Sequence, residues 1–252
     1  MYRRFLIVLA VVCAALLSAI SPTHAVIRGV PDEGAHPYVG LVTDFESFCS
    51  GSLISPTVFI TAAHCFDTPG QEVSVTVDED AFAESATFVT GNWYPDPEFC
   101  VGCGGGLVGF LTHDVAVVIL DEPITVSRYA SLPTEGLVDT LPMRQPVQIV
   151  GYGLQVRPKV AIDEFGTRMR ASVLINRSQS RLSDEFVQVT SNPAQGKGAT
   201  CFGDSGGPVL LGDTILAVNS IASGGCTAPS YAYRIDTEQA LDFITATIEA
   251  HT

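Results

Sequence analysis

The sequence predicts an all-β fold with two halves and one helix at the carboxyl end. Three observations support this fold class: short β-type runs recur between turn residues, a Pro- and Gly-containing connection lies near the middle, and helical periodicity appears only in the tail. Many short strands with frequent turns are typical of a β-sandwich or barrel. The 252 residues, of which 46% are hydrophobic, suffice for a sizeable core.

The first 25 residues have the pattern of an export signal. Arg3 and Arg4 precede an apolar run over residues 5–17, and Ala25 is the small residue that signal peptidase prefers. The apolar stretch 5–20 holds 16 residues, whereas a membrane span needs roughly 20. Val12, which precedes Cys13, is too bulky for a lipoprotein signal. We therefore expect cleavage before Val26, a mature domain over residues 26–252, and a secreted protein, extracellular or periplasmic.

The charge of the chain excludes some partners. Loss of Arg3 and Arg4 changes the formal net charge from −14 to −16. Such a surface favours solubility and repels polyanions. We therefore expect no nucleic acid partner and no stable membrane association.

The β-type runs divide into two groups. They cover residues 73–77, 86–90, 115–120, 147–151, 172–175, 186–190, 208–211 and 215–221. The stretch 121–142 contains three prolines and Gly136, which is typical of a connection. It predicts one sub-barrel over about 26–130 and a second over about 131–235.

The tail is predicted to be a helix. Leu241, Ile244 and Ile248 follow at spacings of three and four residues and form one apolar face. Asp236 is the predicted N-cap.

Three segments together carry the pattern of a nucleophilic hydrolase. They are TAAHC at 61–65, HDVAVV at 113–118 and GDSGGP at 203–208. A serine hydroxyl needs a neighbouring base near neutral pH, and His64 suits that role for Ser205. A carboxylate on the far ring nitrogen fixes the tautomer, which is the role assigned to Asp114.

These segments resemble those of the chymotrypsin/trypsin family in order and spacing. The similarity extends to FCSGSLI at 48–54, GYG at 151–153, Ser220 and the closing helix. It implies two packed six-stranded antiparallel β-barrels and a secreted serine endopeptidase that acts on proteins or peptides. It also implies an oxyanion hole formed by the backbone N–H groups of Gly203 and Ser205.

Other functional classes stay open beside this one. The GDSGG segment also fits the nucleophile elbow of α/β-hydrolases, with Asp236 and His251 as formal partners. An elbow must lead into a helix, however, whereas residues 206–211 have the pattern of a turn followed by a strand. A non-catalytic protease-like binding protein and a serine esterase are further alternatives. The complete triad favours the peptidase. Other histidines, such as His36 and His113, are expected to be ordinary hydrogen-bonded core or turn residues.

The resemblance also suggests how the enzyme is activated. Residues 26–29, VIRG, resemble the family's mature amino terminus. The free amine of Val26 is then the expected ion-pair partner of Asp204, a carboxylate that is costly to bury alone. Signal-peptide removal alone would produce the active form.

Six cysteines remain in the mature chain, and six cysteines allow 15 pairings. The resemblance implies Cys49–Cys65 and Cys201–Cys226. Cys100 and Cys103 lie outside the familiar pattern and could form a local disulfide, a redox pair or half a metal site; without a second pair the disulfide is favoured. We predict no metal and no cofactor.

The resemblance places Ala199 at the floor of the specificity pocket, where a trypsin-like enzyme has an aspartate. Thr200 lies beside it, and Ala222 and Ser230 occupy wall positions that are glycines in open pockets. We therefore expect a small or medium apolar side chain before the scissile bond. Residues 220–222 should pair with the substrate as an added strand. We expect a monomer.

Overall fold

The computed structural model describes residues 26–27, 29–103, 111–157, 160–177, 184–190, 198–222, 226 and 229–252. The predicted signal peptide lies outside these residues. Cleavage before Val26 therefore remains a prediction.

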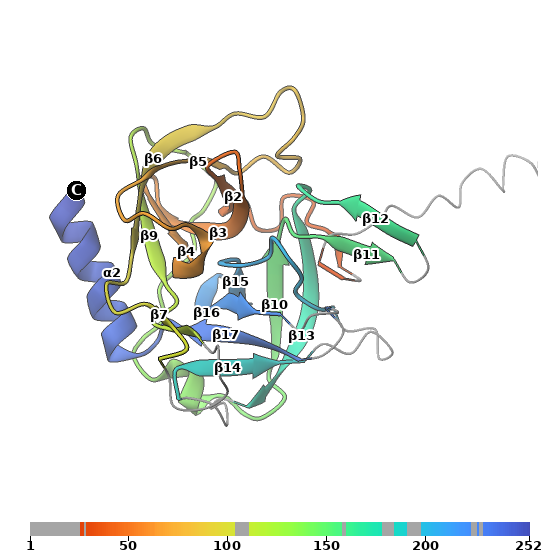
Figure 1. Cartoon of the computed structure of the whole chain (residues 1–252). Coiled ribbons are helices and arrows are strands. Elements are labelled where there is room, and N and C mark those ends of the chain that lie inside the picture. The colour runs from red at the N-terminus through yellow and green to blue at the C-terminus, as the bar shows by residue number, and fades with distance from the viewer. Residues whose placement is uncertain are drawn as a thin grey trace, which may run out of the picture.

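The first half folds into a closed antiparallel barrel of six strands (Figure 1), as expected. Its strand order is β2-β3-β4-β9-β6-β5. The strands are β2 (Val39–Thr43), β3 (Phe48–Ser55), β4 (Val58–Thr61), β5 (Glu72–Thr76), β6 (Val89–Pro95) and β9 (Ala116–Leu120). Apolar side chains such as Leu41, Phe59 and Trp93 fill its interior.

The second half forms the second barrel. Its strand order is β13-β10-β15-β16-β17-β14, and a β13–β14 pairing closes it. The strands are β10 (Pro146–Gly151), β13 (Met169–Arg177), β14 (Phe186–Val189), β15 (Pro208–Leu211), β16 (Thr214–Ile221) and β17 (Ser230–Arg234). Strand β1 (Val30–Pro31) adds to the outer edge of β13.

Shorter elements lie outside the barrels. Two small hairpins pair β7 (Cys100–Val101) with β8 (Leu111–Thr112) and β11 (Gln155–Arg157) with β12 (Val160–Glu164). Two 3-10 turns cover Ala63–Cys65 and Leu137–Thr140.

The predicted strands agree with these elements except in one place. The run at 86–90 was expected to be a strand, but β6 begins only at Val89. The preceding residues form a turn, because Ala86 N donates to Ala83 O at 2.9 Å and Thr87 N donates to Asp78 Oδ2 at 2.7 Å. A side-chain acceptor such as Asp78, which competes with the strand ladder for a backbone N–H, is not visible in the alternation of apolar residues.

The predicted carboxyl-terminal helix is α2 (Glu238–His251), and its predicted N-cap is wrong by one residue. Thr237 Oγ1 accepts from Ala240 N at 3.3 Å and caps the helix. Asp236 instead accepts from Arg234 Nε at 2.9 Å and from Val138 N at 2.7 Å. The helix follows the second barrel in sequence but packs against β9 of the first (Figure 1). Among the described residues no helix is long and apolar enough to cross a membrane.

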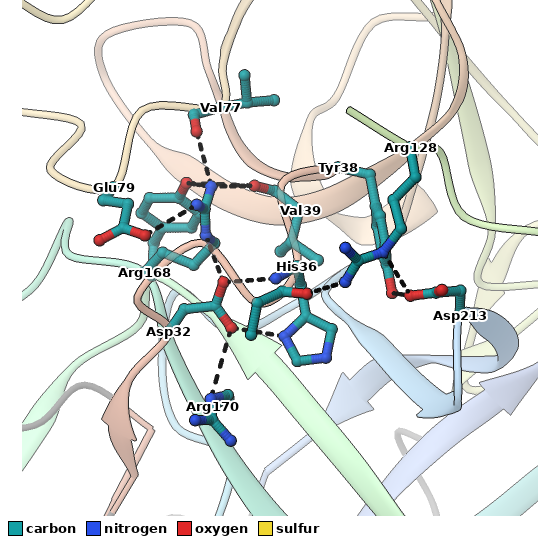
Figure 2. A network of polar contacts seen from close by, with 12 residues as sticks. Asp32, His36, Tyr38, Val39, Val77, Glu79, Arg128, Arg168, Arg170 and Asp213 are labelled. Atoms are coloured by element: carbon teal, nitrogen blue, oxygen red, sulfur yellow. Dashed lines mark hydrogen bonds and ion pairs between the residues drawn. The ribbon is translucent and has the colours of Figure 1, made fainter. Parts of the chain in front are cut away.

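A buried polar network joins the two barrels (Figure 2). Arg168, just before β13, donates through Nη1 to Val39 O at 3.0 Å and to Val77 O at 2.7 Å, both in the first half. Tyr152, just after β10, donates its hydroxyl to Asp78 O at 2.7 Å. These bonds fix the two barrels relative to each other, and the site described next lies at their junction.

Candidate active site

His64 and Asp114 form a two-point contact in the first barrel. His64 follows β4 in a 3-10 turn, and Asp114 precedes β9, which pairs with β4. His64 Nδ1 lies 2.8 Å from Asp114 Oδ2, and His64 N donates to Asp114 Oδ1 at 2.9 Å. Asp114 is fully buried, whereas 23% of the His64 side chain is exposed. Nδ1 of the imidazole is thus held by Asp114, while part of the ring stays exposed to solvent.

The second barrel also holds Asp114. Ser220 Oγ, at the end of β16, donates to Asp114 Oδ2. Burial alone would lower the pKa of His64, but the charge of Asp114 and its hydrogen bond together raise the pKa above its ordinary value. Asp114 therefore favours the protonated imidazole.

Ser205 lies on a tight turn between two strands. Its carbonyl accepts from Ser50 N of β3 at 2.8 Å, and the next residue, Gly206, donates to Asn219 O of β16 at 2.7 Å. The φ angles of Gly203 and Gly206 are +90° and +75°. A Cβ on Gly206 would lie 2.2 Å from Thr61 Oγ1, so only glycine fits this turn.

The hydrogen bonds on both sides of the serine turn connect it to the segments that hold His64 and Asp114. Ser50 follows Cys49, whose disulfide with Cys65 fixes the neighbour of His64. On the other side, β16 carries Ser220, which contacts Asp114. The three predicted triad segments therefore meet at the junction of the two barrels.

Asp204 is completely buried beside Ser205. Its Oδ1 accepts from Gly153 N at 2.9 Å, and its Oδ2 accepts from Cys201 N at 2.8 Å. Burial raises the pKa of Asp204 to about 7, because these two backbone bonds only partly offset the loss of hydration.

The start of the predicted mature chain lies close in the fold to this loop. Val26 is fully buried, and Ile27 exchanges two backbone hydrogen bonds with Ala199, of 3.0 and 3.1 Å. In the full-length chain the Val26 nitrogen belongs to a peptide bond. The expected ion pair with Asp204 is therefore not present here and remains a prediction.

Three disulfides join Cys49 to Cys65, Cys100 to Cys103 and Cys201 to Cys226. The first and third are the pairings that the resemblance implied, and the second is the local bridge. Cys49, His64 and Cys65 each place a potential metal-ligand atom within 4.8 Å of the others. Both sulfurs are oxidised, however, so they offer no thiolate to a metal ion.

The residues expected to form the specificity pocket are mostly buried. Ala199, Thr200, Ser220 and Ser230 are buried, and Ala222 is half-buried. The Cys201–Cys226 disulfide connects two of these chain segments. Within the described part of the chain, Ser230 Oγ is buried and has no hydrogen-bond partner. Residues 191–197, 223–225 and 227–228, which adjoin these positions in sequence, lie outside the described residues.

Two residues with positioning roles were not singled out from the sequence. Ser50 Oγ donates to Gly203 O at 2.8 Å and accepts from Tyr152 N at 2.9 Å, so it ties the serine turn to β10. Phe48 lies against Gly203, since a Cβ on that glycine would be 2.5 Å from the ring. Both residues are direct sequence neighbours of Cys49, and this position beside a predicted disulfide was the sequence signal that could have pointed to their roles.

Two closed antiparallel barrels with His, Asp and Ser segments at their junction define the class of double-barrel serine proteases. The family model described as Trypsin matches residues 26–244, and the chain belongs to this trypsin-like serine protease family.

Relatives and solved structures agree with this assignment. Brachyurin from Leptuca pugilator is 29% identical over 208 residues, which cover 80% of this chain and 88% of brachyurin. Trypsin from Sarcophaga bullata is 27% identical over 243 residues, covering 90% and 91%. The structure of the scabies mite inactivated protease paralogue S-D1 has a TM-score of 0.70 at 20% identity, covering 90% of this chain and 98% of that one. Because that paralogue is named as inactivated, membership of the fold does not by itself establish catalysis.

Proposed function

We propose that this chain is a secreted serine endopeptidase whose catalytic residues are His64, Asp114 and Ser205. The observation that carries the proposal is the two-point bond between His64 and Asp114, 2.8 and 2.9 Å long, beside a glycine-bounded serine turn.

The proposed reaction begins with attack of Ser205 Oγ on the carbonyl carbon of the peptide bond. His64 Nε2 accepts the hydroxyl proton and later gives it to the leaving amine, which releases the carboxyl-terminal product. Water then attacks the carbonyl carbon of the acyl-enzyme, and His64 again accepts a proton and returns it to the leaving group, Ser205 Oγ. Asp114 holds the tautomer with Nδ1–H toward itself and stabilises the imidazolium in each half-reaction.

Binding of the oxyanion that forms on the substrate carbonyl is assigned to the backbone N–H groups of Gly203 and Ser205. The left-handed backbone at Gly203 and the two bonds of Ser50 support a preorganised loop there. Fixed donors aimed at the developing charge are worth about 10²–10³ in rate each.

The proposed preference is for a small or medium apolar side chain before the scissile bond. Ala199 carries no charge at the proposed floor, and Ser230 is a buried, uncharged residue at a proposed wall position. A pocket without a carboxylate leaves the charge of Arg or Lys unpaired.

Maturation is proposed to consist of signal-peptide removal alone. The new amine of Val26 would then stabilise the charged form of Asp204, the neighbour of the nucleophile. The bonding of Ile27 to Ala199 and the only partly compensated burial of Asp204 support this step.

A panel of chromogenic peptides differing only in the residue before the cleaved bond tests the proposal. The chain beginning at Val26 should cleave the Ala, Val or Leu members faster than the Arg and Lys members, and Ser205→Ala should cleave none. Hydrolysis of esters without hydrolysis of peptides would indicate the esterase. Inactivity of the folded wild-type chain on all substrates would indicate the non-catalytic binding protein.

A further inference from the structure

A surface pocket of about 410 Å³ lies on the second barrel, where β15 ends. Strand β15 begins at Pro208, next to the serine turn, and ends at Leu211, which lines the pocket. Because a strand rises roughly 3.3 Å per residue, the pocket lies well away from the proposed catalytic residues, none of which belongs to its described lining. We call it the β15 pocket, and its polar lining consists of His36, Gln148, Ser172 and Asp213.

His36 is the buried polar residue of the β15 pocket, with only 6% of its surface exposed. His36 N donates to Asp32 Oδ2 at 2.7 Å, and His36 Nδ1 lies 2.5 Å from Asp32 Oδ1. The same two-point contact joins His64 to Asp114. The second ring nitrogen of His36, Nε2, lies on the side away from Asp32 (Figure 2) and has no hydrogen-bond partner among the described residues. It is therefore available to a ligand in the pocket.

Asp32 determines which nitrogen of His36 carries the proton. Burial alone would raise the pKa of Asp32, but the hydrogen bonds from His36 and the charges of His36 and Arg168 lower it below its ordinary value. An ionised carboxylate only accepts hydrogen bonds, so Nδ1 carries a proton. The neutral imidazole then presents an unshared electron pair on Nε2 to the pocket.

Asp213 supplies a second acceptor. Its Oδ1 accepts from the Tyr38 hydroxyl at 2.9 Å and from Arg128 Nε at 3.1 Å. Burial would raise the pKa of Asp213, but these hydrogen bonds and the charges of Arg128 and His36 lower it. The carboxylate is therefore ionised at neutral pH, and within the described part of the chain its Oδ2 has no hydrogen-bond partner.

Gln148 and Ser172 add two uncharged polar groups beside an apolar wall. They lie opposite each other in the pairing of β10 with β13, and Gln148 is also paired with Leu210 of β15. Directly paired residues share one face of a sheet, so the amide, the hydroxyl and the Leu210 side chain line the pocket together. Pro146 and Leu211 extend the apolar part of the lining.

The β15 pocket thus combines hydrogen-bond acceptors with aliphatic walls. His36 Nε2, Asp213 Oδ2 and the side-chain oxygens of Gln148 and Ser172 all accept hydrogen bonds. A primary ammonium group carries three N–H donors and a positive charge, and the alkyl stem that bears it packs on apolar surface. The formal net charge of −14 also attracts a cation.

We propose that the β15 pocket binds a primary alkylammonium group, which is either the side chain of a lysine or a free alkylamine. His36 Nε2 and Asp213 Oδ2 accept from the ammonium, Gln148 or Ser172 accepts its third N–H, and Leu210 contacts the methylene groups. This site takes no part in the proposed peptidase reaction, so either proposal can fail without the other.

The test is an NMR titration of the folded chain that begins at Val26 and carries Ser205→Ala, so that self-cleavage does not disturb the measurement. Butylammonium should shift the ring nitrogen resonances of His36 with a Kd of about 1 mM. The ring resonances of His64 and His113 should stay in place. Butanol, which has the same stem without the charge, should bind at least about tenfold more weakly.

Asp213→Asn should weaken the binding of butylammonium about tenfold, because the charged acceptor is lost. Asp121→Asn is the matched control, since Asp121 is also exposed and accepts from a hydroxyl, that of Thr90, but does not line the pocket. Its affinity for butylammonium should equal that of the parent chain.

A glycine peptide with one central lysine distinguishes the two sources of the ammonium. If it shifts His36 as butylammonium does, the pocket accepts a lysine of another chain; if only butylammonium shifts His36, the pocket accepts free amines. Absence of any shift of His36, equal affinities for butylammonium and butanol, or an unchanged affinity in Asp213→Asn would overturn the proposed site. Hydrolysis of peptides by the wild-type chain is measured separately and is unaffected by that outcome.

Discussion

Arg168 donates through Nε to Asp32 Oδ2 at 3.1 Å, and both side chains are almost completely buried. The remaining acceptors of the guanidinium include the carbonyls of Val39 and Val77 and the Tyr152 hydroxyl (Figure 2). His36 Nδ1 contacts the same carboxylate at 2.5 Å. One charged group from the second half thus satisfies several buried acceptors of the first.

Arg168→Met should destabilise the fold strongly. It removes the guanidinium donor from two carbonyls and from Asp32, which keeps only its His36 donors. Breaking a buried pair costs about 3–5 kcal/mol. Arg170 Nε, 3.9 Å from Asp32 Oδ1, compensates in part, so we expect the lower end of that range. Urea unfolding measures the change.

Arg128→Met is the matched control for this substitution. The Arg128–Asp213 pair is about half exposed, and such pairs contribute about 0–1 kcal/mol. Equal losses in the two variants would contradict the assigned importance of the buried pair.

Asp114→Asn should abolish most activity without unfolding the protein. In one orientation the amide sets a donor against His64 N, and in the other against His64 Nδ1 and Ser220 Oγ. Loss of this tautomer control lowers kcat by about 10⁴-fold. Asp121→Asn, which alters an exposed carboxylate bonded to Thr90, is the control. A loss of less than tenfold would exclude the assigned role of Asp114.

The pH dependence of wild-type activity follows from the raised pKa of His64. The reaction needs the neutral imidazole, so kcat/KM falls as the pH drops through that pKa, which lies above the ordinary value near 6.5. The pH profile of peptide hydrolysis measures this limb. An acid limb with its midpoint well below pH 6.5 would contradict the charge interaction with Asp114.

Ala199→Asp should redirect the enzyme toward basic residues. A carboxylate at the proposed pocket floor pairs with Arg or Lys, and we expect the ratio of kcat/KM for Arg over Leu to rise about 10²-fold. Ala199→Asn supplies the same shape without the charge. If both variants change the ratio equally, Ala199 is not at the pocket floor.

The amino terminus should change how stability depends on pH. With an uncleavable extension before Val26, Asp204 has a folded-state pKa of about 7, raised above its unfolded value of about 3.9. The folded state then holds the extra proton between these values. The unfolding free energy therefore falls as the pH rises through this window, by up to about 1.4 kcal/mol per pH unit.

The chain that begins at Val26 should lack this slope, because its ammonium stabilises the charged carboxylate. Urea unfolding of both forms between pH 4.5 and 7 compares the slopes. Asp204→Asn in the extended chain should also remove the slope. Parallel curves for the extended and processed wild-type chains would refute the ion pair.

Local patterns predicted the strands, the division into two halves and the helix, because these depend on nearby residues, whereas the two six-stranded barrels were implied by the family resemblance. Turn residues bound each strand, and the GDSGGP segment leads into β15 as expected of a turn that enters a strand. The helix cap was misassigned because Asp236 is engaged by Arg234 and Val138. Val138 lies 98 residues away, so no local spacing rule contains this partner.

The site was predictable where it follows a motif and not where it depends on packing. The His64–Asp114 contact lies where the motifs suggested. By contrast, Phe45, Phe48, Phe82, Phe88 and Phe165 line one surface hollow but come from three separated segments, and only folding brings them together. The bridging role of Ser50 likewise depends on the approach of β3 to the serine turn.

The most direct test of the proposed function is fluorophosphonate labelling of the folded chain that begins at Val26. The label requires a serine activated by its base. One label per chain on Ser205, located by peptide mass and absent from His64→Ala, is the expected result. A folded wild-type chain that stays unlabelled, or that is labelled elsewhere, would contradict the assignment of Ser205, His64 and Asp114 as a working catalytic triad.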